Sequence, residues 1–125
     1  MYGVLSGVKT AGGGATIDIA SVTASTEYCG FVLDITIGGT GVSGQAIYYI
    51  AKRYVITAGG ATYPTTIGTD ATSNCTLAIA WVSGQTFKIS VTNTLAGGAG
   101  IGFSIAVSGG GANNAVGYLT SIIAL

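Results

Sequence analysis

The chain has 125 residues, of which 22 are glycine, one is proline and none is histidine. Only 6% of the residues are charged, and four cationic residues balance four anionic ones. This composition excludes the basic surface that binds nucleic acid, and a surface so poor in charge favours association between copies. We therefore expect a single domain, residues 1–125, that forms a homo-oligomer, with a trimer favoured.

Residues 1–14 read MYGVLSGVKTAGGG, and we expect them to form an N-terminal arm or an edge strand. They lack the basic start and the apolar core of a secretory signal, so we expect a protein that is made in the cytoplasm of a cell. In that compartment the formal glycosylation sequon at Asn74 carries no meaning. Every apolar stretch is shorter than the roughly 18 residues that a membrane helix needs, which predicts no membrane partner.

A two-residue alternation of apolar and polar side chains runs through most of the chain and predicts β-strands with one buried face. Glycine-rich segments separate these strands, and Ser83–Gly84 predicts a two-residue hairpin turn. The expected fold is all-β: an antiparallel β-sandwich, jelly-roll-like, with Gly-rich loops. The inward faces are expected to carry Cys29, Phe31, Leu33, Ile35 and Ile37, then Cys75, Leu77, Ile79 and Trp81, then Phe87, Ile89 and Val91, then Ile101, Phe103, Ile105 and Val107.

Residues 39–44 match the pattern G-x-G-x-x-G, whose glycines approach a pyrophosphate at the start of a helix in dinucleotide-binding folds. The segment that follows, residues 45–57, has apolar residues at helical spacing but also alternates as a strand, and it is rich in Ile, Tyr and Val. Because no other segment looks helical, we interpret the glycines as a loop between strands and expect no cofactor. Alanine at Gly39 and Gly41 is expected to strain this loop wherever φ is positive, without removing a ligand.

The charged residues do not form a catalytic pattern. Without histidine there is no ordinary triad, and the four carboxylates are scattered along the chain. Asp18 and Asp34 have outward parity, which is typical of solubilising charges. Lys52 and Arg53 are neighbours on a strand and are expected to face opposite sides. We predict no catalytic residue and no enzyme.

The two cysteines and the single tryptophan are expected in the core. Cys29 and Cys75 share the parity of core residues, which favours buried free thiols over metal ligands, with a disulfide as the open alternative. Trp81 is expected to be buried beside one of the core phenylalanines, Phe31, Phe87 or Phe103. In the alternative, Trp81 or the Tyr48–Tyr49 pair stacks on a sugar.

The uncharged C-terminus follows the SGGGANN loop and has no polar face. Residues 116–125 are expected to form a closing strand that must be covered on both faces, at the centre of the sandwich or between subunits. We predict that this segment lies against a neighbouring subunit. The candidate contacts between subunits are Val116, Tyr118, Leu119, Ile122, Ile123 and Leu125.

The layout of short strands in CTLAIAWVSGQTFKISVTNT and GIGFSIAV resembles small β-sandwich virion proteins of tailed bacteriophages, over roughly residues 15–108. The proteins that it resembles are head decoration (cement) proteins and the terminal domains of tail fibres. The resemblance implies a non-enzymatic structural protein of the virion, typically trimeric, with a major capsid protein or a host surface glycan as its partner. One domain without an attachment region favours the decoration role, with a tail-fibre tip as the alternative.

Two further functions stay open. A carbohydrate-binding module would account for the sandwich and the tyrosines. A strand-exchanging filament subunit would account for the uncharged segment YLTSIIAL, as a strand donated to a neighbour.

Overall fold

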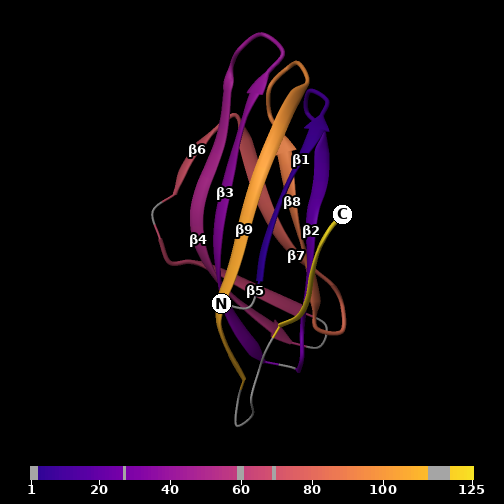
Figure 1. The fold of residues 1–125 in the computed structure, drawn as a ribbon, viewed down its shortest axis with the longest axis vertical. Coiled ribbons are helices and arrows are strands. Elements are labelled where there is room, and N and C mark those ends of the chain that lie inside the picture. The colour runs from indigo at the N-terminus through magenta and orange to yellow at the C-terminus, as the bar shows by residue number, and fades with distance from the viewer. Residues whose placement is uncertain (1–2, 27, 59–60, 69, 113–118) are drawn as a thin grey trace.

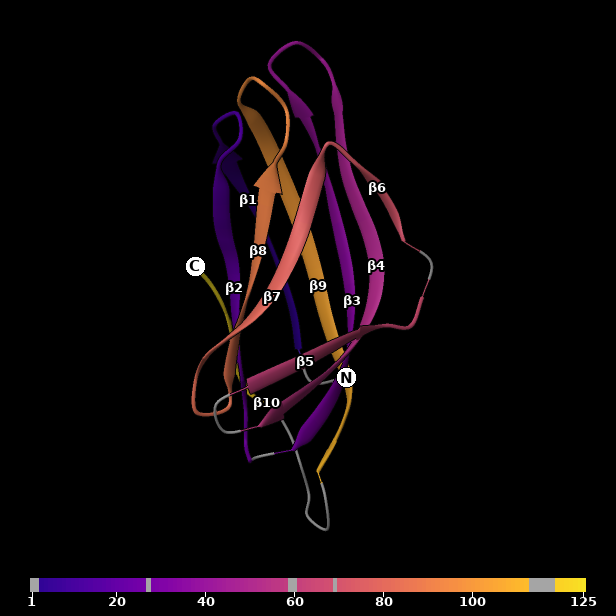
Figure 2. The same ribbon diagram turned by 180° about the vertical axis from the view of Figure 1, so that it is seen from behind.

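The computed structural model describes residues 3–26, 28–58, 61–68, 70–112 and 119–125. These residues form ten strands and no helix, in two antiparallel sheets that face each other (Figures 1 and 2). The all-β antiparallel sandwich expected from the alternation is therefore confirmed.

Sheet A, the larger of the two, has six strands. Its order is β1 (Gly3–Ala11), β9 (Ala99–Ala112), β3 (Cys29–Gly41), β4 (Ala46–Ala58) and β5 (Ala61–Thr66), and the short β6 (Ala71–Ser73) also pairs with β4. Sheet B has the order β10 (Leu119–Ala124), β2 (Thr16–Ala24), β8 (Thr86–Asn93) and β7 (Cys75–Ser83). The connections β1–β2, β2–β3, β6–β7 and β8–β9 each carry the chain from one sheet to the other.

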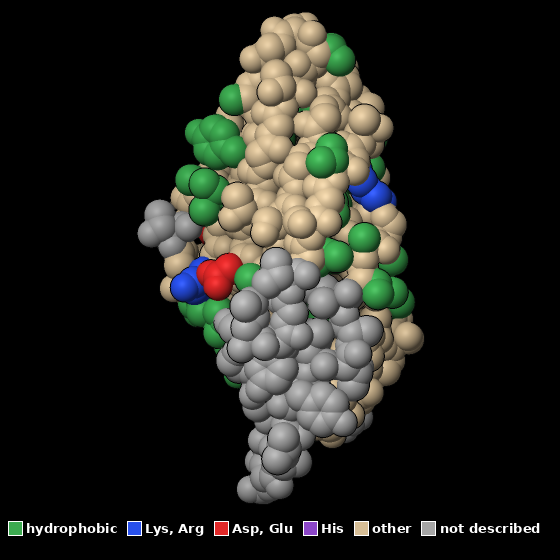
Figure 3. All heavy atoms as spheres, viewed as in Figure 1, with side chains coloured by type: hydrophobic (Ala, Val, Ile, Leu, Met, Phe, Trp, Pro, Cys, Tyr) green, Lys and Arg blue, Asp and Glu red, His purple; other side chains and the backbone are tan. Residues whose placement is uncertain are grey.

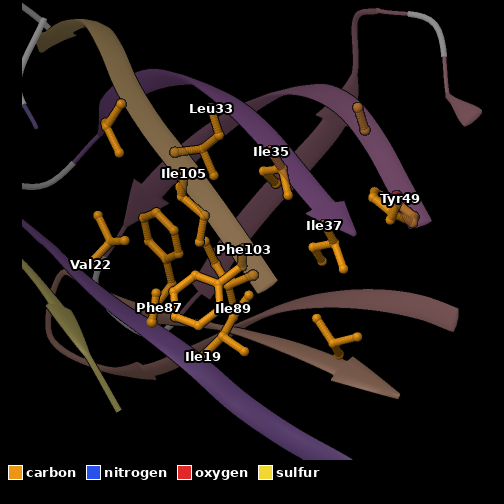
Figure 4. Packing of buried hydrophobic residues seen from close by; sticks show 14 of the residues in the cluster. Ile19, Val22, Leu33, Ile35, Ile37, Tyr49, Phe87, Ile89, Phe103 and Ile105 are labelled. Atoms are coloured by element: carbon orange, nitrogen blue, oxygen red, sulfur yellow. The ribbon is translucent and has the colours of Figure 1, made fainter. Parts of the chain in front are cut away.

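The core lies between the two sheets and follows the predicted parity. The inward side chains of β3 and β9 face those of β2 and β8, so three phenylalanines and many β-branched residues pack together (Figure 4). The largest side chains that are almost fully buried are Phe31, Phe87, Ile19, Leu33, Ile35, Ile37, Ile47, Ile89, Ile101 and Ile105. Cys29 and Cys75 are both buried and are not joined by a disulfide, as predicted.

The placement of Trp81 in the core was wrong, because its side chain is 41% exposed. Trp81 pairs with Phe87 across β7 and β8, and the register shifts between Trp81 and Ser83. The indole Nε1 donates a hydrogen bond to the carbonyl of Gly84 at 3.0 Å, which ties the ring to its own hairpin. Since β7 is an edge strand, Trp81 has a neighbouring strand on one side only. The inward direction of its side chain is therefore not enough to bury the ring.

Two turns differ from the sequence prediction in detail. The β7–β8 turn consists of Gly84 and Gln85, one residue later than expected, and Gly84 has a φ of 53°. At the β3–β4 turn, Gly44 has a positive φ of 84°, whereas Gly39 and Gly41 belong to β3 and do not have positive φ. Gly39 is needed for a different reason, since a Cβ there would collide with the backbone carbonyl of Gly100 in β9.

Candidate functional site

The residues after the G-x-G-x-x-G pattern form strand β4, as their alternation predicted, and not a helix. The glycines therefore lie in β3 and in the turn that follows it, in a context unlike the strand-to-helix junction that cradles a pyrophosphate. The chemistry-bearing side chains lie elsewhere, along the two flanks of the sandwich and on the outer face of sheet A. We call the side between β4 and β7 the closed flank, and the side between β1 and β2 the open flank.

An arginine cluster occupies the closed flank. The Arg53 guanidinium binds both carboxylate oxygens of Asp70, at 2.8 and 3.0 Å, and it also donates to the Tyr49 hydroxyl. The guanidinium carbon lies 5.6 Å from the centre of the Tyr49 ring, which adds a cation–π contact. The Arg53 side chain is only 12% exposed, whereas that of Asp70 is 36% exposed. Two parallel bonds in a partly buried site make this the most specific ion pair of the described residues.

The electrostatics of the cluster follow from these contacts. The hydrogen bond from Arg53 lowers the pKa of Asp70, and the hydrogen bond to Asp70 raises the pKa of Arg53. Burial raises the pKa of the Tyr49 phenol, against the opposing effect of the Arg53 charge. At neutral pH Arg53 is therefore cationic, Asp70 anionic and Tyr49 neutral. The cluster joins β4 to the segment before β6.

The chain crosses from sheet A to sheet B directly above this cluster, between β6 and β7. Asn74 makes the corner with a φ of 58°, a conformation that asparagine tolerates better than most residues. Its side-chain amide donates to the carbonyl of Ala46 at 2.8 Å, and the Cys75 thiol donates to the carbonyl of Tyr48 at 3.4 Å. Burial raises the pKa of Cys75, so the thiol stays protonated. These bonds join β7 to the edge of β4.

Four further charged residues lie on the outer faces, as their parity predicted. Asp18 accepts hydrogen bonds from Ser90 at 2.7 Å and from Lys88 at 3.3 Å on the outside of sheet B. The Ser90 bond, more than the Lys88 contact, lowers the pKa of Asp18. Lys52 pairs with Asp34 at 3.4 Å on the outside of sheet A, and so faces away from Arg53, as expected of neighbours on a strand.

The open flank, where the β1–β2 connection crosses between the sheets, also has a groove. The groove measures about 450 Å³ and is lined by Val8, Lys9, Thr10 and Ile17. Lys9 has inward parity on the edge strand β1, and its ammonium donates to the backbone carbonyl of Asp18 in β2 at 2.9 Å. This hydrogen bond joins the two sheets across the groove.

The outer face of sheet A has glycines at its centre. The strand register places Val8, Gly102, Gly38 and Tyr48 in one row across four strands. A Cβ at Gly38 would meet no atom within 4 Å, so packing does not require a glycine there. Figure 3 shows this face, with backbone and polar side chains across its centre and hydrophobic side chains toward its sides. Tyr48, which is 40% exposed, therefore stands in one row with Gly38 and Gly102, which carry no side chain and which we call the glycine floor.

The predicted contact residues of the C-terminus are only partly within the described chain. Val116 and Tyr118 lie outside the described residues. Leu119 and Ile122 belong to β10, whose backbone pairs with β2 of the same chain. The side chains of Ile123 and Leu125 are 54% and 45% exposed. Their role between subunits stays a prediction.

In the described part of the chain, no group of three or more cysteine, aspartate or glutamate side chains is arranged to hold a metal ion. Among the same residues, no helix has the length and hydropathy to span a bilayer.

No model of a known protein family matches the chain, and no curated protein matches it. Among solved structures, the tailspike protein of Acinetobacter phage vB_ApiP_P1 is similar over 94% of this chain, with a TM-score of 0.57 and 16% sequence identity. The tailspike protein of Acinetobacter baumannii phage AM24 also aligns over 94% of this chain, at 12% identity and a TM-score of 0.44. This chain spans only 22% and 28% of the lengths of those two proteins. The sandwich therefore shares its fold with one part of the vB_ApiP_P1 tailspike.

Proposed function

We propose that this chain is a non-enzymatic structural component of a phage virion: a self-associating β-sandwich that forms part of a tail spike or tail fibre. The observation that carries the proposal is the fold shared with part of the vB_ApiP_P1 tailspike over 94% of this chain. The likeness favours a place on the tail over the decoration of the capsid, which the sequence alone had favoured.

Exposed apolar side chains support self-association. Large hydrophobic residues that are at least 40% exposed occur on both sheets and at both ends of the sandwich, in a chain with only eight charged residues. Surfaces of this kind are covered in the working assembly of a protein, because exposed apolar patches mark sites of association. A trimer is the expected state. The residues are Val8, Tyr28, Val42, Tyr48, Ile50, Ile67, Trp81, Val82, Ile123 and Leu125.

The carboxylates support a structural role. Asp18, Asp34 and Asp70 each have a cationic partner, Lys88, Lys52 and Arg53 respectively. A hydrolase that works with two carboxyl groups needs them close together, on either side of the scissile bond. Here each of the three is committed to an ion pair on its own part of the surface.

Two measurements test the proposal. Light scattering of the purified chain should give the mass of a trimer at micromolar concentration, and a monomer would contradict self-association. Electron microscopy of the particle that carries the chain, labelled with an antibody against it, should place the label on the tail. Label spread over the capsid would restore the decoration role, and release of reducing ends from a capsular polysaccharide would overturn the non-enzymatic assignment.

A second function, binding of a host surface glycan, is favoured by Tyr48 beside the glycine floor of sheet A. A pyranose ring would stack on the Tyr48 phenol, and hydroxyl side chains on the same face of sheet A would bind the polar groups of the sugar. On a glycan array, Tyr48→Ala should abolish any binding that the wild type shows. Trp81→Ala is the matched control, since Trp81 is equally exposed, at 41% against 40%, but lies at the β7–β8 hairpin. Loss of binding in the control alone would move the site to the hairpin.

A further inference from the structure

The open flank is covered along only part of its length. Strand β10 pairs with β2 from Ala24 to Ala20, and the Leu125 amide reaches the carbonyl of Ile19 at 3.4 Å. Beyond that point, no described strand pairs with Thr16–Asp18 on the side away from β8. The groove lined by Val8, Lys9, Thr10 and Ile17 begins where the cover of β10 ends.

The groove is mostly apolar, and its one charged side chain already has a hydrogen-bond partner. Val8 is 79% exposed at its rim, and Ile17 is partly buried and packs against the core. The Lys9 ammonium, the single charge of the lining, is held by the Asp18 carbonyl. An occupant therefore needs apolar side chains and does not need a negative charge.

An apolar projection lies beside this hollow. Ile123 stands opposite Ser21 in the β10–β2 pairing, and Leu125 lies next to Ile19, two positions along β2 from Ile17. Both side chains are about half exposed. Both views of the ribbon place the C-terminus beside the middle of β2, between the covered and the uncovered part of the flank (Figures 1 and 2). Each copy thus presents the apolar groove and, beside it, a projection formed by the apolar side chains of Ile123 and Leu125.

We propose that the groove of one copy receives the Ile123–Leu125 end of a second copy, so that this contact joins the subunits of the assembly. The inference rests on the proposed function, which requires self-association, and adds the surface through which it occurs. Because every copy carries both halves, the contact repeats from copy to copy and closes into a ring when the rotation between neighbours allows it. The outer edge of β10 and the edge of β2 at Thr16–Asp18 then form one continuous surface that the neighbour covers.

Two single substitutions test the contact from its two sides. Val8→Asp places a charge at the rim of the groove, and Ile123→Asp places one on the projection. Both positions are exposed in the single chain, so the melting temperature of the subunit fold should be retained. Each variant should weaken self-association by about tenfold or more, because an unpaired carboxylate would be buried in an apolar contact. Val42→Asp is the matched control: Val42 is 80% exposed but lies in the β3–β4 turn, so this variant should keep the wild-type mass.

Mixing the two variants gives the decisive result. Val8→Asp retains a working projection and Ile123→Asp retains a working groove. At a concentration at which each variant alone is a monomer, an equimolar mixture should therefore form a heterodimer. A mixture that stays monomeric, or a Val8→Asp variant with the wild-type mass, would overturn the proposed contact while leaving self-association intact. A monomeric wild type would instead overturn the self-association of the proposed function and, with it, this inference.

Discussion

The two flanks of the sandwich are closed in different ways. At the closed flank the chain itself crosses between the sheets, and the Arg53–Asp70 pair, Asn74 and Cys75 fix the crossing with hydrogen bonds. At the open flank the β1–β2 connection crosses between the sheets, β10 covers part of β2, and the Lys9 side chain bonds across the groove. The closed flank therefore satisfies its polar groups within the chain, whereas the open flank leaves apolar side chains and a strand edge exposed.

This difference between the flanks indicates where a further molecule can bind without breaking interactions within the chain. Displacing the closed flank would break charge-assisted bonds and leave partly buried polar groups without partners. Covering the open flank would remove apolar surface from water and pair an exposed edge, both of which are favourable. We therefore expect substitutions in the closed flank to act on the stability of the subunit, and those on the surface of the open flank to act on its assembly.

One asparagine near each flank gives the largest expected contrast. Asn93, which is fully buried, donates to the carbonyls of Ala11, Gly12 and Gly97 at 3.0 to 3.2 Å and accepts from the Leu95 amide at 2.9 Å. Asn93→Ala should lower the free energy of unfolding by about 2–4 kcal/mol, because these buried groups lose their partner.

The matched substitution at the closed flank is Asn74→Ala. It removes one exposed hydrogen bond and places alanine at a positive φ, so it should cost only about 1 kcal/mol. Denaturant titration of both variants measures the two losses. If both variants lose the same free energy of unfolding, Asn74 would be as important for the crossing between β6 and β7 as Asn93 is for the loops around it.

Breaking the arginine cluster should have the next largest effect. Arg53→Leu removes the bonds to Asp70 and to the Tyr49 hydroxyl, and we expect a loss of about 2 kcal/mol in the free energy of unfolding. Arg53→Lys is the control, since an ammonium keeps the charge but lacks the paired geometry, and it should recover only part of the loss. Full recovery by lysine would mean that charge alone holds this flank.

Acid should weaken the same cluster. The pKa values of Asp70 and Asp18 are lowered in the folded chain, so both groups bind fewer protons there than in the unfolded chain. Their contribution to stability is present above the unfolded pKa of about 4 and is lost as the pH falls through the folded values. Thermal melts should be nearly constant between about pH 5 and 8, since the chain has no histidine, and should fall below about pH 4. In the Arg53→Leu background the acid loss should shrink, and an unchanged loss would place its origin elsewhere.

The smallest expected effect is at Lys9. Lys9→Ala removes one partly buried hydrogen bond across the open flank and should lower the free energy of unfolding by only about 0.5–1 kcal/mol. A loss above about 2 kcal/mol, measured by denaturant titration, would show that Lys9 and not β10 holds this side of the sandwich together.

The strands and most of the core were predictable from the sequence. The alternation in residues 29–37, 87–91 and 101–107 assigned every inward side chain correctly, because both neighbours of β3, β8 and β9 in their sheets are other strands. The G-x-G-x-x-G pattern was interpreted as a loop between strands, which is correct for Gly44, whereas Gly39 and Gly41 belong to β3. The pattern failed at edge strands. Trp81 and Lys9 both have inward parity, yet one is exposed and the other bonds across a groove.

The sequence by itself determined the class of fold, because backbone pleating makes side-chain direction a local property that two neighbouring residues reveal. It also determined the poverty of charge that favours association. Only the tertiary structure decided which inward side chains are buried. Burial depends on which residues of the opposite sheet and of the neighbouring strands pack against them. Arg53 shows this most directly: its parity is that of a core residue, and it is held there because the fold brings Asp70, 17 residues away in the chain, against it. The pairing of β10 with β2 from Ala24 to Ala20 is likewise a tertiary contact that no local pattern in β2 reveals.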